Sequence, residues 1–257
     1  MNGRGTQDDV QTLLLEVIRR RAAFEALESE PMSKRELAET VGVSGATAHR
    51  ILASFREWGL IERSDEGHGV TPLGTEIGRA AGDYRARVET ALRLEPLFSA
   101  VDLDGTFDIG TFADATVTVA EHGNPYGPLN RFTTLLEETE SLRGFDTTSV
   151  APTYVEDIHA KIADGMSVEV VYDYGIVDQL ATEYAQLAAD AFDRDNLVLR
   201  VHEDVPFGLA LFDDRVGIGG YDDETGLLTV FVDTDDSGAI EWGERLFESY
   251  WEGSSAV

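Results

Sequence analysis

The chain of 257 residues contains no cysteine, and only two of its basic residues are lysines. The lack of cysteine excludes disulfides, thiolate metal sites and cysteine nucleophiles. No apolar run approaches the length of about 20 residues that a membrane helix needs, so we expect no contact with a membrane. The N-terminal segment also lacks the apolar stretch of a signal peptide, which leads us to expect a cytoplasmic protein.

Positive charge is scarce and unevenly distributed along the chain. Residues 1–82 hold ten basic and thirteen acidic residues, a net charge of −3, whereas residues 83–257 hold ten and thirty-six, a net charge of −26. An acidic surface of this kind is typical of halophilic proteins, because salt at 1 M shortens the Debye length to roughly 3 Å. An acidic face for a cationic partner is the alternative. Only the nearly neutral first third is suited to approach the phosphates of a nucleic acid.

That first third has the pattern of a winged helix-turn-helix. Ser33 and Glu36 form a capping box that predicts a helix over 34–41. Gly42 can adopt a left-handed turn, and Ser44 can cap the helix that follows. A first helix over 8–29 would support this pair, and short strands over 60–63 and 69–71 would form the hairpin wing around the turn 64–68. We therefore predict a DNA-binding domain over residues 1–82.

The second helix of the motif would read the DNA. Its apolar residues at 48, 51, 52 and 55 recur at helical spacing and predict a buried stripe, which leaves the remaining side chains for the major groove. Basic and hydroxyl side chains can bind phosphates or base edges. The predicted contacts to double-stranded DNA are Lys34, Arg35, Ser44, Gly45, Ala46, Thr47, His49, Arg50, Ser54, Arg63 and His68.

A long helical pattern over 72–97 follows the wing. A helix in this position often pairs with its copy, so we predict a homodimer with a linker or dimerisation helix over 83–100. The alternative, a helix that only caps its own domain, is left open by the sequence.

Residues 101–257 alternate between strand and helix patterns, which predicts a mixed α/β domain. The predicted strands are 106–110, 115–120, 144–150, 167–173, 196–202, 207–212, 215–221 and 226–232. The predicted helices are 126–141, 153–163, 176–192 and 237–252. Short acidic turns separate the last three strands and predict an antiparallel meander. Only the ends, 1–7 and 253–257, look disordered.

Patterns for catalysis and for metals are weak. His159 and Lys161 match the start of the H-x-K-x-x-x-x-D motif of phospholipase D, but Met166 stands where its aspartate belongs. No histidines have metal-ligand spacing, so we expect no enzyme activity, no cofactor and no metal. Aromatic and basic residues near the ends of two predicted strands could hold a small anion or a sugar as an effector. These candidates are Tyr172, Tyr174, Arg200 and His202.

The stretch Phe107-Asp108-Ile109-Gly110-Thr111-Phe112-Ala113-Asp114-Ala115-Thr116-Val117-Thr118-Val119, with the closing segment 230–236 and Trp242, resembles archaeal regulators of the methanogenesis regulatory protein type, which are abundant in haloarchaea. The resemblance implies a transcription factor with an N-terminal winged domain and a C-terminal sensing or dimerising domain. The C-terminal pattern is also similar to the phospholipase-D-like sensor half of archaeal sugar-responsive regulators, without its catalytic residues.

The sequence thus predicts an α+β protein. A winged helix-turn-helix and a linker helix would precede a C-terminal mixed α/β domain that resembles a non-catalytic phospholipase-D-like sensor. The predicted function is a dimeric DNA-binding regulator that senses a small effector. The competing hypothesis is a non-catalytic small-molecule binding protein, or a degenerate phosphodiesterase, whose winged domain makes only protein contacts.

Overall fold

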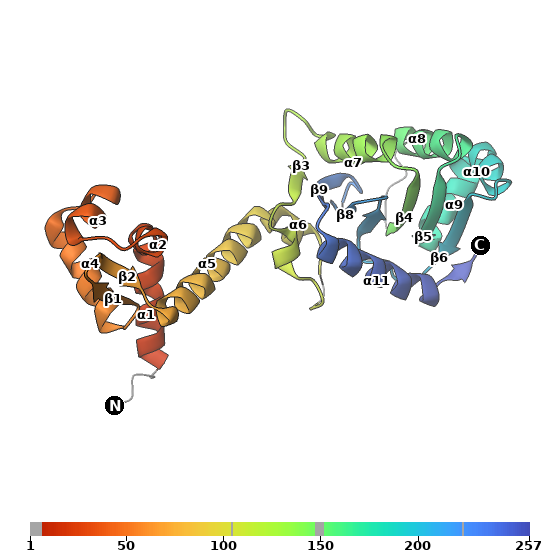
Figure 1. The fold of residues 1–257 in the computed structure, drawn as a ribbon. Coiled ribbons are helices and arrows are strands. Elements are labelled where there is room, and N and C mark those ends of the chain that lie inside the picture. The colour runs from red at the N-terminus through yellow and green to blue at the C-terminus, as the bar shows by residue number, and fades with distance from the viewer. Residues whose placement is uncertain (1–6, 104, 147–151, 223) are drawn as a thin grey trace. The chain divides into compact units, whose positions relative to one another are not determined.

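The computed structural model describes residues 7–103, 105–146, 152–222 and 224–257. The chain divides into two compact units, Met1–Glu89 and Thr90–Val257, and each is described by itself (Figure 1). The division lies inside a long helix, within the range 83–100 that the sequence assigns to a linker. No helix among the described residues is both long and apolar enough to cross a membrane.

The N-terminal unit contains a bundle of helices followed by a hairpin. Its elements are α1 (Gln7–Arg19), α2 (Arg21–Ser29), α3 (Lys34–Thr40), α4 (Gly45–Glu57), β1 (Ile61–Ser64), β2 (Gly67–Val70) and the start of α5 (Pro72–Arg93). Phe24 of α2 and Phe55 of α4 meet edge to face at the centre of its core, with 5.5 Å between ring centroids. The predicted helix over 8–29 breaks at Arg20, and this allows Val17 and Leu27 to reach the same core from α1 and α2.

The C-terminal unit is built on one mixed sheet. Its elements are α6 (Glu95–Ala100), η1 (Ile109–Phe112), β3 (Thr116–Val119), α7 (Gly127–Glu137), β4 (Ser141–Asp146), α8 (Pro152–Ala163), β5 (Ser167–Tyr172), α9 (Tyr174–Glu183), α10 (Ala185–Phe192), β6 (Leu197–Val201), β7 (Gly208–Leu211), β8 (Val216–Tyr221), β9 (Leu228–Thr234), α11 (Ser237–Gly253) and β10 (Ser255–Ala256). The strand order is β10-β6-β5-β4-β7-β8-β9-β3. Strands β4, β5 and β6 are parallel, and all other neighbours are antiparallel. The predicted meander is confirmed as β7, β8 and β9.

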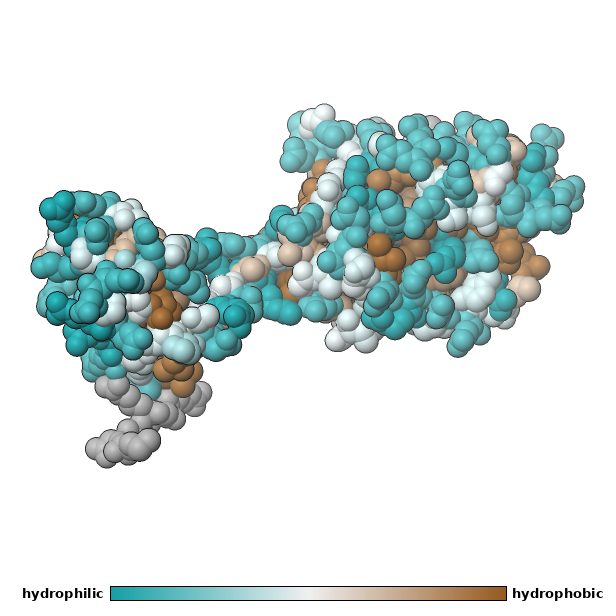
Figure 2. Space-filling model, in the orientation of Figure 1, coloured by the Kyte–Doolittle hydropathy of each residue, from teal (hydrophilic) through white to brown (hydrophobic). Residues whose placement is uncertain are grey.

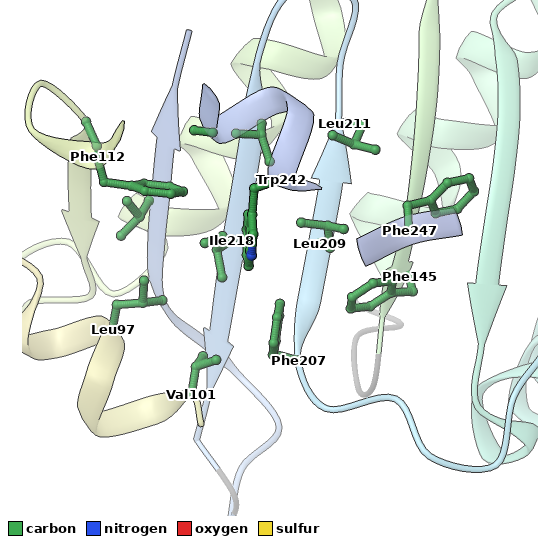
Figure 3. Packing of buried hydrophobic residues seen from close by; sticks show 14 of the residues in the cluster. Leu97, Val101, Phe112, Phe145, Phe207, Leu209, Leu211, Ile218, Trp242 and Phe247 are labelled. Carbon is green, nitrogen blue, oxygen red and sulfur yellow. The ribbon is translucent and has the colours of Figure 1, made fainter. Parts of the chain in front are cut away.

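Helices cover both faces of this sheet (Figure 1). Helices α6 and α11 pack on one face, where Leu97, Ile218 and Trp242 belong to one buried cluster (Figure 3). The Trp242 ring nitrogen donates to the Thr106 hydroxyl at 3.1 Å, so the buried indole keeps a hydrogen-bond partner. Helices α7 and α8 pack on the opposite face around Phe132. The α+β fold class predicted from the sequence is confirmed.

Several predicted elements need correction. Residues 106–110 form no strand: Asp108 caps the 3-10 helix η1 by accepting from the Gly110 N–H at 3.0 Å. The single helix predicted over 72–97 ends at Arg93, and the one over 176–192 breaks at Tyr184. At the C-terminal end, where the sequence predicts disorder, Ser255 and Ala256 pair with β6. The predicted strand over 144–150 is found as β4, three residues earlier, and its residues 147–150 lie outside the described residues.

The surface of each unit is largely polar. Figure 2 shows that hydrophilic residues cover most of the visible face of both units, with hydrophobic residues in small groups between them. The C-terminal unit carries eight basic and thirty-four acidic residues, a formal net charge of −26, and the N-terminal unit a net charge of −3. The electrostatic asymmetry that the sequence shows therefore coincides with the division into units.

Candidate nucleic-acid interface

Helix α3 begins with a complete capping box. The Ser33 hydroxyl accepts from the Glu36 N–H at 3.3 Å, and the Ser33 N–H donates to the Glu36 carboxylate at 2.8 Å. These hydrogen bonds to Ser33 hold the pKa of Glu36 below its usual value. Lys34 and Arg35 are exposed in the first turn, where their charges add to the positive end of the helix dipole. Arg35 is paired with Glu39 at 3.1 Å.

The turn between α3 and α4 depends on Gly42, which has a φ of 68°. L side chains disfavour this conformation, which glycine adopts readily. After the turn, the Ser44 hydroxyl accepts from the Thr47 N–H at 3.2 Å and lies 3.0 Å from the Thr47 hydroxyl. Ser44 and Thr47 are thus hydrogen-bonded to each other at the start of α4.

Helix α4 separates an apolar face from a polar one, as the sequence predicts. Its buried residues are Ala48, Ile51, Leu52 and Phe55. Gly45, Ala46, His49 and Arg50 are exposed, and Ser54 is partly buried. Within the described part of the chain, no hydrogen bond or ion pair engages Arg50, so its five N–H donors are available to a ligand.

The wing is a tight hairpin with a two-residue turn, shorter than the five-residue turn predicted over 64–68. Arg63 faces His68 across the hairpin, and the His68 backbone pairs with Met32 through N–O distances of 2.8 and 3.0 Å. Burial, together with the charges of Arg56 and Arg63, lowers the pKa of His68. His68 is therefore a neutral, partly buried side chain at neutral pH, whereas Arg63 is exposed.

The structure brings most of the predicted contact residues onto the N-terminal unit as exposed side chains of α3, α4 and β1. Arg56, which was not among them, joins this set, because the end of α4 places its charge beside His68 and Arg63. The sequence leaves the role of Arg56 open, because Glu57 and Glu62 are close enough in the chain to form an ion pair with it. The wing tip carries Asp65 and Glu66, so positive charge lies at the base of the wing and not at its tip.

The four candidate effector residues do not form one site. Arg200 donates to the Ser254 hydroxyl at 2.6 Å, and its guanidinium stacks on Trp251 with 5.0 Å to the ring centroid. His202 packs on Tyr250 of the same helix, α11. Tyr172 faces the other side of the sheet, because it is next in sequence to Val171, which packs in the α11-side core. The side chain of Tyr174 is mostly exposed at the start of α9.

A cavity of about 330 Å³ lies on the Tyr172 side of the sheet. Strands β5 and β6 form its floor, and α8, α9 and α10 form its walls. Its described lining is aliphatic except for His159 and Tyr172.

The residues of the broken phospholipase motif make structural contacts. His159 Nε2 lies 2.9 Å from the Asp190 carboxylate, and Lys161 donates to the Glu137 carbonyl at 2.7 Å. Both side chains thus connect α8 to neighbouring helices. Among the described residues, no group of three histidine, cysteine or acidic side chains could hold a metal ion.

Two protein-family models match the chain. Residues 125–253 match the family model of the methanogenesis regulatory protein FilR1, middle domain. Residues 7–93 match the model of the HVO_A0261 N-terminal domain. A search of curated protein sequences gave no match.

A search of solved structures gave matches of low sequence identity. TrmBL2, an archaeal chromatin protein described as having a novel mode of DNA binding, is 16% identical over 98% of this chain and 100% of its own, with a TM-score of 0.45. The phospholipase D family member Nuc from Salmonella typhimurium is 14% identical over 56% of this chain and 97% of its own, with a TM-score of 0.46. NucT from Helicobacter pylori is 14% identical over 56% and 98%, with a TM-score of 0.42.

Proposed function

The chain belongs to the family defined by the middle domain of the methanogenesis regulatory protein FilR1, and from this premise we propose that it is a transcriptional regulator that binds double-stranded DNA through α4. The observation that carries the proposal is the capped helix α4, which buries one face completely and presents Arg50 and His49 on the other. A DNA-binding regulator acts where the DNA is, which places the protein in the cytoplasm.

Charge supports the assignment of the N-terminal unit as the DNA-binding part. Arg50 is free of intramolecular partners in the described part of the chain, and Arg56 of the same helix, Lys34 of α3 and Arg63 of β1 are also exposed. Phosphate contacts from such residues position the protein, and a bidentate arginine can read guanine in the major groove. The acidic C-terminal unit repels phosphates, so binding depends on these few side chains and on salt that screens the acidic body. The acidic composition suits a halophilic cell.

Replacing Arg50 with alanine should weaken specific DNA binding by about 10- to 100-fold, because one base or phosphate contact contributes about 1–3 kcal/mol. The test is fluorescence anisotropy, in a KCl titration, with genomic fragments selected by the wild-type protein. Arg245→Ala is the matched control: Arg245 is exposed on α11 and lies 3.9 Å from Glu241, so the charge change is the same. Equal binding by Arg50→Ala and Arg245→Ala would favour the alternative in which the winged domain makes only protein contacts.

We further propose that the protein is a homodimer through α5. Residues 82–89 of this helix are all exposed, and Tyr84, Val88 and Leu92 form an apolar row with a spacing of four residues. Tyr84 is 62% exposed and Leu92 is 72% exposed, which is unusual for large apolar side chains on one helix face. A second copy fits this row, because Arg85 and Glu89, which pair with each other at 2.6 Å, flank it with opposite charges that the same pair of a partner helix can meet.

Val88→Glu should convert the dimer to a monomer, because it places a charge in the middle of the apolar row. Sedimentation velocity at several protein concentrations measures the change. Leu227→Glu is the control, since Leu227 is also an exposed apolar residue but lies in the loop before β9. A wild-type protein that sediments as a monomer at all concentrations would refute the dimer without affecting the DNA-binding proposal.

The C-terminal unit, in this proposal, senses a small effector and communicates its presence to the DNA-binding unit. The support is the cavity beneath α8, α9 and α10, which is within the size range of small-molecule sites. No catalytic role is part of the proposal.

A further inference from the structure

The cavity between β5, β6 and helices α8 to α10 has an unusual chemical composition. Val168 and Val170 of β5 alternate toward it, and Leu197 and Leu199 of β6 pair with them in register. The helices contribute further aliphatic side chains. The cavity is open to solvent on one side, and its volume is within the range of small-molecule sites, which are lined mainly by apolar side chains.

Tyr172 supplies a polar group at the end of this floor. Its hydroxyl makes no hydrogen bond with the described residues, although the neighbouring Tyr221 hydroxyl donates to Asp146 at 2.8 Å. Burial and the nearby Asp146 carboxylate raise the pKa of Tyr172, so the hydroxyl keeps its proton and remains a donor at neutral pH. A partly buried donor without a partner gains stability when a ligand offers an acceptor.

The other polar side chain, His159, is already engaged. Its Nε2 atom lies 2.9 Å from Asp190, which also accepts from Arg194 at 3.0 Å. No lysine or arginine is among the described lining residues, and the unit around the cavity has a formal net charge of −26. An anion would lose its hydration in this cavity without a cation to compensate. A sugar would leave several hydroxyl groups without partners, for the same reason.

We infer that this cavity binds a small, neutral, mainly aliphatic molecule that carries one hydrogen-bond acceptor, held by the Tyr172 hydroxyl. The inference rests on the proposed function only in giving this ligand the role of effector. It differs from the anion or sugar predicted from the sequence, because the structure separates Tyr172 from Arg200 and His202. The ligand would cover aliphatic side chains of α9 and α10 and thereby fix these helices on the sheet.

Isothermal titration of the full chain with 2-octanone, octanoate and glucose tests the inference without DNA. We expect saturable binding of 2-octanone, binding of octanoate at least about tenfold weaker, and no binding of glucose. No binding of 2-octanone, or tighter binding of octanoate or glucose, would overturn the inference. So would 2-octanone binding that weakens as protein concentration rises, since a second copy of the chain would then fill the cavity.

Variants locate the site and the donor. A phenylalanine side chain would fill the cavity from α10 in Ala188→Phe and from α9 in Ala181→Phe, so each variant should lose binding of 2-octanone. Ala181→Phe replaces Ala188→Phe in the test if the latter fails to fold. Ala160→Phe on the exposed side of α8 is the matched control and should bind normally. Tyr172→Phe should weaken binding of 2-octanone by about three- to tenfold and leave butylbenzene, which has no carbonyl acceptor, unchanged. Normal binding by both filled variants, or an equal loss for both ligands in Tyr172→Phe, contradicts the assignment.

These measurements are independent of the DNA-binding test. A protein that binds 2-octanone but not DNA retains the cavity assignment and loses the proposed function. A protein that binds DNA but no neutral ligand retains the proposed function and loses the cavity assignment.

Discussion

Replacing Asp233 with alanine is expected to destabilise the C-terminal unit by about 3–5 kcal/mol, the largest effect of any single change discussed for this protein. Asp233 lies on β9 and is completely buried. Arg131 of α7 donates to both of its carboxylate oxygens at 2.8 and 2.7 Å, and Arg215 donates to it at 2.9 Å. The alanine variant leaves these two partly buried guanidinium groups without their main partner. High salt would not rescue it, because buried charges are screened poorly.

Asp235→Ala is the matched control for this prediction. Asp235 pairs with the same Arg215 at 3.3 Å but is 72% exposed, so its loss should change stability by about 1 kcal/mol or less. Urea denaturation followed by tryptophan fluorescence measures both variants in a Trp58→Phe background, which leaves Trp242 and Trp251 of the C-terminal unit as reporters. Similar midpoints for the two variants would mean that the buried position of Asp233 has no energetic consequence. The urea midpoint of Asp233→Asn, which keeps the shape of the side chain, should lie between those of Asp233→Ala and Asp235→Ala.

The second large effect is expected at Gly74, near the start of α5. A Cβ atom at this position would lie 2.1 Å from the Leu60 carbonyl oxygen and 2.7 Å from Val70. The Leu60 carbonyl also accepts from the Thr71 N–H at 2.9 Å, so it cannot move without loss of that bond. Gly74→Ala should therefore destabilise the N-terminal unit by about 1–3 kcal/mol. DNA binding should weaken with it, because the unit that carries α4 opens more often.

Gly82→Ala, in the same helix, should change stability in the opposite direction. A Cβ atom at Gly82 meets nothing within 4 Å, so alanine should stabilise α5 by about 0.5–1 kcal/mol through its higher helix propensity. Hydrogen exchange measured by mass spectrometry, on peptides from α2 and α4 of the full chain, reads out the N-terminal unit alone. Faster exchange in both variants, or in neither, would contradict the steric argument.

Local signals in the sequence were sufficient to predict the helices and the turn of the N-terminal unit. The capping pair Ser33 and Glu36, the turn at Gly42 and the buried stripe of α4 each depend on residues within a few positions of one another. Signals of this range are read from a single sequence. The break in the helix at Arg20 could not be predicted from the sequence, because no glycine or proline marks it. The break follows from the packing of Val17 and Leu27 into a common core. The 3-10 turn at Asp108 was missed because its flanking residues alternate as a strand would.

The candidate effector site shows the limit of such reasoning. Tyr172 and Arg200 both lie near the ends of parallel strands, which made them look like neighbours. Their side chains face opposite sides of the sheet, and the one-residue alternation that decides this depends on the register between β5 and β6. No sequence pattern indicated the cavity, because the aliphatic residues that line it have the same pattern as those of any buried helix or strand.

The sequence by itself determined the winged helix-turn-helix, the α+β class and the concentration of negative charge in the C-terminal two thirds, because these follow from local spacing and composition. Only the tertiary structure decided which distant side chains meet. It buried Asp233 between Arg131 and Arg215, placed Tyr172 beside an aliphatic cavity without a hydrogen-bond partner among the described residues, and engaged His159 with Asp190. Such contacts join residues far apart in the chain, and their energies depend on burial, which no local pattern of residues encodes.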